Sequence, residues 1–103
     1  MRFDWDSRKS DRNLAERGFD FAFATLVFDG PTLERRDTRE DYGEVRLVAV
    51  GLADRIPLTV VYTDRIAAEG GAVVRRIISA RLSNRRERQA YLEVFPSGDA
   101  PSR

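Results

Sequence analysis

Residues 44–81, EVRLVAVGLADRIPLTVVYTDRIAAEGGAVVRRIISAR, decide the fold class of this chain. The stretch contains three runs rich in β-branched residues, at 44–51, 58–65 and 72–81. Six residues separate the first two runs, and glycines mark a turn between the second and third. Strands joined by links this short pair with their sequence neighbours, so the stretch predicts an antiparallel meander.

Outside the meander the sequence predicts two short strands and three helices. The strands are residues 2–5 and 32–36; the helices are 7–17, 21–28 and a last one that begins near Asn84. The order of elements predicts an α+β fold, with two N-terminal helices and a C-terminal helix packed on a twisted antiparallel β-sheet. We expect one domain over residues 1–95 and a disordered tail over 96–103.

Composition excludes several classes of chemistry. The 103 residues include no cysteine and no histidine, which removes disulfides, thiolate zinc sites and every catalytic triad that needs an imidazole. We therefore expect no metal and no cofactor. No apolar run reaches the roughly 20 residues of a membrane-spanning helix. The first residues also lack the apolar stretch of a secretory signal, so we expect a cytoplasmic protein with no membrane partner.

Positive charge is concentrated in one segment. Seventeen of the 18 basic residues are arginines, and Lys9 is the exception. Residues 75–88 contain six arginines and one acid, Glu87, and so carry a net charge of +5 in a chain that is +1 overall. A basic strip on a near-neutral domain indicates a polyanion or an acidic protein as partner. The alternative is a solvated surface with intrahelical ion pairs.

Strand alternation predicts which of these arginines meet. In the last run it places Val74, Arg76, Ile78 and Ala80 on one face, which we assign to the core because it is the more apolar. The open face would then gather Glu44, Arg46, Arg75, Ser79 and Arg81. A carboxylate there can take the proton of a ribose 2′-OH while guanidinium groups neutralise the phosphate. The alternative is structural ion pairing between strands.

Seven short motifs, in this order, resemble the BrnT family of type II toxins over residues 3–92. They are Phe3-x-Trp5-Asp6-x-x-Lys9-x-x-x-Asn13, Gly18-Phe19-x-Phe21, Ala24-x-x-Val27-Phe28-Asp29-Gly30-Pro31, Gly43-Glu44-x-Arg46 with Val50-Gly51, Val60-Val61-Tyr62-Thr63, Arg76-Ile77-Ile78-Ser79-Ala80-Arg81 and Arg85-Arg86-Glu87-Arg88-x-x-Tyr91. The family often has a His-Gly pair where this chain has Arg17-Gly18.

The resemblance implies a RelE-like fold and a metal-independent endoribonuclease toxin that cleaves RNA to inhibit translation and growth. It implies a cognate BrnA-like antitoxin with a ribbon-helix-helix DNA-binding part, and contact with operator DNA only through that antitoxin. The motif positions with suitable chemistry are Lys9, Glu44, Arg46, Arg65, Arg76 and Arg81.

Combining charge and resemblance, we assign two sets of site residues. The catalytic set is Glu44, Arg46, Arg65 and Arg81, with Glu44 as the base. The RNA-binding set is Lys9, Arg75, Arg76, Arg85 and Arg88. The alternative is a non-catalytic binding module that docks an antitoxin or nucleic acid.

Overall fold

The computed structural model describes residues 1–96 and confirms the α+β class. Its elements are β1 (Arg2–Trp5), α1 (Ser7–Arg17), α2 (Phe21–Ala24), the 3-10 helix η1 (Thr25–Asp29), β2 (Leu33–Arg36), β3 (Leu47–Ala53), β4 (Ile56–Ile66), β5 (Val73–Leu82) and α3 (Arg85–Val94). Apart from Pro96, the tail predicted at 96–103 lies outside the described residues.

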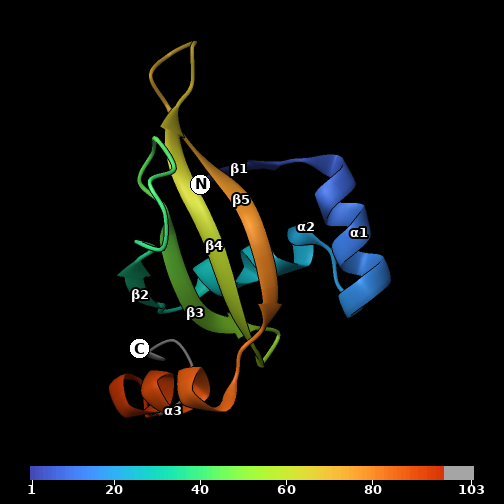
Figure 1. Ribbon diagram of the computed structural model, residues 1–103, viewed down its shortest axis with the longest axis vertical. Helices are drawn as coiled ribbons and strands as arrows, with labels where there is room; N and C mark the ends of the chain where they lie inside the picture. Colours follow the sequence, from blue (N-terminus) through green and yellow to red (C-terminus); the bar gives the residue numbers. More distant parts are fainter. Residues whose placement is uncertain (97–103) are drawn as a thin grey trace.

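The five described strands form one sheet in the order β1-β5-β4-β3-β2 (Figure 1). The meander from β2 to β5 is antiparallel throughout, as predicted. Strand β1 instead lies parallel to β5, so the sheet is mixed rather than wholly antiparallel. No hairpin sets the direction of β1, because α1, α2 and the other strands all separate it in sequence from β5.

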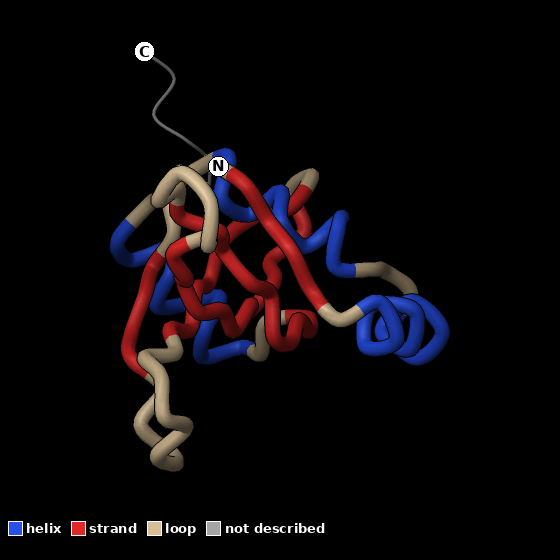
Figure 2. The backbone as a smooth tube through the Cα atoms, turned by 90° about the horizontal axis from the view of Figure 1, so that it is seen from above, coloured by secondary structure: helices blue, strands red, loops and turns tan. Residues whose placement is uncertain are grey.

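The prediction that the helices pack on one face of the sheet and leave the other open is wrong. Segments α2 and η1 cover one face, where Phe21, Ala24 and Val27 pack with Val60 and Tyr62 in the core. Burying a large apolar side chain of this kind stabilises the fold by roughly 1.5–3 kcal/mol. Helix α3 contacts the opposite face, and α1 lies beside the strands, at the right of the molecule in Figure 2.

Helix α1 is fixed to the edge of β5 by its last residue. The Arg17 guanidinium donates to the Ala80 carbonyl at 2.8 Å and to the Asn13 side chain at 3.1 Å. Strand β1 ends opposite Ile77, so Arg17 satisfies an acceptor on the edge that β1 leaves uncovered. The Arg17 side chain therefore has a structural role, since it joins α1 to β5.

A bulge in β5 overturns the predicted assignment of faces. Val61 pairs with Ser79 and Tyr62 with Ile77, which leaves Ile78 without a partner on β4. The extra residue reverses the alternation, so both Ile77 and Ala80 are buried in the core although they are three residues apart. Strict alternation had placed these two residues on different faces. No feature of the sequence around Ile78 predicts that a bulge occurs there.

The turn between β3 and β4 is strained. It consists of Asp54 and Arg55, whose φ angles are 49° and 69°. A two-residue turn with positive φ at both positions usually carries Asn-Gly, because a Cβ atom in this region costs roughly 1–2 kcal/mol per residue. Arginine at the second position retains that strain.

We expect Arg55→Gly to stabilise the protein by about 0.5–1 kcal/mol, since relief of strain exceeds the greater entropy of glycine in the unfolded chain. Thermal unfolding followed by circular dichroism should show a midpoint a few degrees higher, at about 4–8 °C per kcal/mol. The control Arg55→Val keeps a Cβ atom and adds β-branching, so its midpoint should fall. A glycine variant that melts below the parent would contradict this account.

Candidate functional site

The sheet has one face that α2 and η1 do not cover, and we call it the open face. Register places Thr59 and Thr63 of β4 on it, because their neighbours Leu58, Val60 and Tyr62 point into the core. Arg81 lies opposite Thr59, and Arg76 lies opposite Thr63. The bulge therefore brings onto one face two arginines that strict alternation separates.

Glu44 reaches this face from the loop that precedes β3, not from the strand predicted over 44–51. Two hydrogen bonds hold the loop: the Thr63 hydroxyl donates to the Val45 carbonyl at 2.7 Å, and the Asp37 amide donates to the Arg46 carbonyl at 2.8 Å. The two residues that follow Glu44 are thus attached to β4 and to the residue after β2, which limits where its carboxylate can lie.

The Glu44 carboxylate binds two arginines. Its Oε2 lies 3.2 Å from Nε of Arg46, and its Oε1 lies 3.2 Å from Nη2 of Arg65 at the far end of β4. The Glu44 side chain is 26% exposed, so an incoming ligand can reach it. Three of the four residues of the predicted catalytic set therefore meet at one carboxylate.

Opposing effects set the pKa of Glu44. Burial raises it, but hydrogen bonds from Arg65 and Arg46 outweigh burial and leave the pKa below its usual value. The carboxylate is consequently ionised at neutral pH. A carboxylate this well paired is a weak base until an arginine leaves it.

Lys9 and Arg76 complete this group of side chains. Nη1 of Arg76 lies 3.3 Å from Oδ1 of Asp4 on the neighbouring strand β1. The pKa of Lys9 is lowered first by partial burial and then by the positive charges of Arg46 and Arg76, so its ammonium lies within electrostatic range of both. We refer to Lys9, Glu44, Arg46, Arg65 and Arg76 as the Glu44 cluster.

Arg81 does not join the Glu44 cluster. Its two terminal nitrogens each lie 2.8 Å from an oxygen of Glu87 on α3. Arg81 is opposite Thr59, four residues along β4 from Thr63, which is a distance of about 13 Å. Glu44 and Arg81 thus share a face but are too far apart to hold one phosphate oxygen, and Arg81 attaches α3 to the sheet.

Arg75 lies on the helix-covered side. Its guanidinium pairs with Asp64 through contacts of 2.8 and 2.9 Å and stacks on the rings of Tyr62 and Phe28, with its carbon 4.1 and 4.7 Å from the ring centroids. The side chain is only 16% exposed. This geometry supports a packing role, and RNA binding by Arg75 stays a prediction without structural support.

The two predicted RNA-binding residues of α3 are on the surface. Arg85 begins the helix and is exposed, and Arg88 donates from Nη1 to the Ser83 carbonyl at 2.7 Å. Both lie at the α3 end of the open face, with Arg81, and away from the Glu44 cluster.

Three residues of the loop before β3, Asp37, Arg39 and Tyr42, were not among the predicted site residues. The buried Asp37 carboxylate accepts from Nε and Nη2 of Arg39 at 2.8 Å each, and this pairing lowers its pKa to about 2. The Arg46 guanidinium lies 4.0 Å from the ring centroid of Tyr42. No sequence signal distinguished these residues from the rest of a polar loop.

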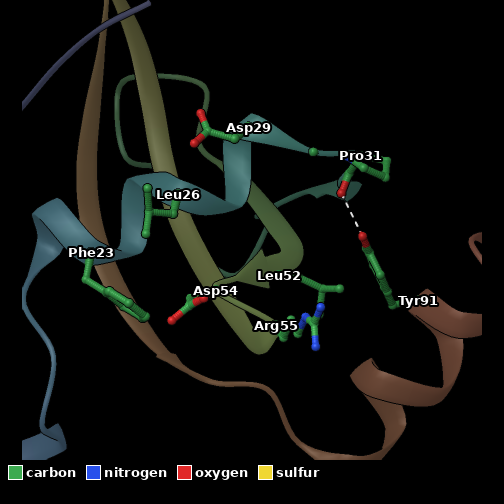
Figure 3. Close-up of a pocket in the computed structure, with 9 residues that line it drawn as sticks. Phe23, Leu26, Asp29, Pro31, Leu52, Asp54, Arg55 and Tyr91 are labelled. Atoms are coloured by element: carbon green, nitrogen blue, oxygen red, sulfur yellow. Dashed lines mark hydrogen bonds between the residues drawn. The ribbon is translucent and has the colours of Figure 1, made fainter. Parts of the chain in front are cut away.

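A pocket at the other end of β3 is not part of this site. It has a volume of about 420 Å³ and lies between η1, the strained turn and Tyr91, whose hydroxyl donates to the Pro31 carbonyl at 2.9 Å (Figure 3). Asp54 and Arg55 border it where β3 ends, whereas Glu44 precedes the start of β3.

Two further kinds of site are absent from residues 1–96. In this range no three acidic side chains gather as the ligands of a metal ion would. No helix in the same range has the length and apolarity to cross a membrane.

The Arg81–Glu87 pair makes stability depend on pH. Hydrogen bonds from Arg81, followed by that from the Asn84 amide, lower the pKa of Glu87 to about 2 from a usual value of 4.5. A depressed carboxyl pKa contributes stability above the usual value, and this is lost as pH falls through the folded value. We expect unfolding free energy to fall between about pH 4.5 and pH 2.

Between about pH 4.5 and pH 2, the free energy of unfolding of Glu87→Gln should depend less steeply on pH than that of the parent. At neutral pH the variant should lose about 1 kcal/mol or less of unfolding free energy, because Arg81 is partly exposed. Urea unfolding at several pH values measures both. The control is Glu93→Gln on the same helix, since Glu93 is exposed and makes no ion pair within residues 1–96. Parallel pH profiles for the two variants would refute this role for the pair.

Comparison with known proteins gives one result. The family described as "Ribonuclease toxin, BrnT, of type II toxin-antitoxin system" matches residues 5–87. A search of curated proteins found no match.

Proposed function

The chain belongs to the BrnT family of ribonuclease toxins of type II toxin–antitoxin systems, and from that premise we propose that the Glu44 cluster cleaves RNA without a metal ion. One observation carries the proposal: a partly exposed carboxylate binds two arginines at 3.2 Å on an open sheet face. Lys9 lies within electrostatic range of Arg46 and Arg76, so a phosphodiester bound here would meet a base and several cations.

The proposed reaction is attack by the ribose 2′-oxygen on the adjacent phosphorus. Glu44 accepts the proton of the 2′-OH as the bond from O2′ to phosphorus forms. The bond from phosphorus to O5′ breaks, and Lys9 donates the proton that O5′ takes up. The products are a 2′,3′-cyclic phosphate and a 5′-OH end, while Arg46, Arg65 and Arg76 stabilise the charge on the pentacovalent phosphate.

Substrate binding would itself activate the base. Arg46 and Arg65 hold Glu44 in the free protein, and a phosphate competes for the same guanidinium groups. Each hydrogen bond that moves from the carboxylate to the phosphate removes an influence that depresses the pKa of Glu44. The carboxylate thus becomes a stronger base only when RNA is bound.

The remaining cations extend the proposed site. Three arginines near α3 would bind phosphates that flank the cleaved bond: Arg81, Arg85 and Arg88. Arg81 already donates two hydrogen bonds to Glu87, so it would bind a phosphate only in competition with that carboxylate. We propose that loss of RNA inhibits translation and growth in the cytoplasm. A BrnA-like antitoxin with a ribbon-helix-helix part would neutralise the toxin and carry the complex to operator DNA.

Labelled RNA incubated with the purified protein in EDTA tests this mechanism. We expect cleavage to persist in the chelator and to yield cyclic phosphate ends. Glu44→Gln and Arg65→Ala should each reduce the rate by ~10²–10³-fold, because each removes a group that acts in the transition state. Arg88→Ala should instead mainly reduce the salt dependence of RNA binding, by about one unit of slope.

The matched control is Arg36→Gln, which removes an exposed arginine of β2 outside the cluster and should cleave at the parental rate. Cleavage that disappears in EDTA would exclude a metal-independent reaction. Tight RNA binding without any cleavage would favour the binding-module alternative.

The pH profile of cleavage provides a separate prediction. Glu44 must be ionised and Lys9 protonated, so the rate should fall at low pH as Glu44 gains a proton and at high pH as Lys9 loses one. Because the pKa of Lys9 is lowered, the alkaline limb should begin below the usual lysine value of 10.5. Lys9→Arg should remove this limb, whereas an unchanged profile would exclude Lys9 as the proton donor.

A further inference from the structure

A groove of about 440 Å³ lies on the open face between α3 and the strands β2 and β3. Figure 1 shows α3 beneath the strands β2 and β3 that carry the rest of the lining. Its lining includes four apolar side chains: Leu33, Val48 and Val50 from the strands and Ala90 from α3. Leu33 pairs directly with Val50, so these side chains form a continuous apolar floor.

Two unpaired cations border this floor. Arg35 and Arg86 both line the groove and are exposed, and neither makes an ion pair within residues 1–96. The acids beside them are already engaged: Glu34 accepts from the Tyr62 hydroxyl, and Glu87 holds Arg81. The groove therefore offers apolar surface between two exposed guanidinium groups that form no ion pair within residues 1–96.

This combination fits an acidic peptide better than RNA. The phosphates of RNA can pair with the two arginines. The charged RNA backbone cannot, however, bury the apolar surface of Leu33 and Val50. A peptide with one apolar side chain between carboxylates fills the floor and pairs with both cations. Type II systems pair the toxin with a protein antitoxin, which is a partner of the required kind.

We propose that an acidic, amphipathic segment of the antitoxin docks in this groove, with an apolar side chain against Val48, Val50 and Ala90 and carboxylates on Arg35 and Arg86. The inference rests on the proposed function in taking this chain as the toxin of such a pair. Val48 lies near the start of β3, two residues after Arg46 of the Glu44 cluster. A peptide segment bound in the groove can therefore extend from Val48 to the proposed catalytic residues. The groove is thus a binding site for the antitoxin next to the proposed catalytic site that the antitoxin would block.

The test measures binding of the antitoxin encoded by the gene next to that of the toxin, by titration calorimetry with the full-length toxin. Ala90→Arg fills the groove with a bulky cation and should weaken binding by at least ~10-fold, as loss of a well-packed anchor pocket does. The control Gln89→Arg adds the same side chain at an exposed position of α3 and should bind as the parent does.

A second variant, Arg35→Glu with Arg86→Glu, reverses the charge of the rim without touching the apolar floor. It should also weaken binding, and the difference from the parent should shrink at high salt because exposed charges are screened. This double variant tests the docking site even if Ala90→Arg fails to fold. Parental affinity in a folded Ala90→Arg protein, or in the double variant, would overturn the proposal.

RNA cleavage by each free variant separates this inference from the proposed function. We expect both variants to cleave RNA at the parental rate, since neither touches the Glu44 cluster. If Ala90→Arg loses cleavage but keeps antitoxin affinity, the groove serves RNA and the docking proposal is wrong. If the parent itself cleaves no RNA while both variants lose antitoxin affinity, the ribonuclease mechanism fails and the docking surface stands.

Discussion

The arrangement of the open face depends on one extra residue in β5. Because Ile78 has no partner on β4, the strand reverses its alternation in the middle, and Arg76 and Arg81 come to the same side although they are five positions apart. The same reversal lets Ile77 and Ala80 both enter the core. A bulge removes a hydrogen bond between the two strands. In return, β5 directs Ile77 and Ala80 to the core and Arg76 and Arg81 to the open face.

The charged layer is largely neutralised within the free protein. Glu44 holds Arg46 and Arg65, Asp4 holds Arg76, and other carboxylates hold Arg39 and Arg81. Such pairs contribute little to stability where solvent reaches them, but they keep several like charges from repelling one another on one small face. In the proposed reaction a phosphate would replace a carboxylate as the partner of an arginine.

The arginines of this chain divide into those that hold the fold and those that face solvent. Arg17 attaches α1 to the edge of β5, the Arg75 guanidinium lies over the rings of Tyr62 and Phe28, and Arg81 attaches α3 to the sheet. Arg65 and Arg86 remain open to a ligand. The basic strip over residues 75–88 therefore overstated the charge available for RNA, since its members point in different directions and several are engaged.

The sequence by itself determined the α+β class, the antiparallel meander and the helix starts at Asp6 and Asn84, because each follows from local periodicity, turn residues and capping side chains. It also selected Glu44, Arg46 and Arg65, which do meet. Tertiary structure alone decided the parallel pairing of β1, the face taken by α3 and the separation of Arg81 from Glu44. Those features arise from contacts between distant segments and from a bulge that shifts register, and short-range patterns carry no information about either.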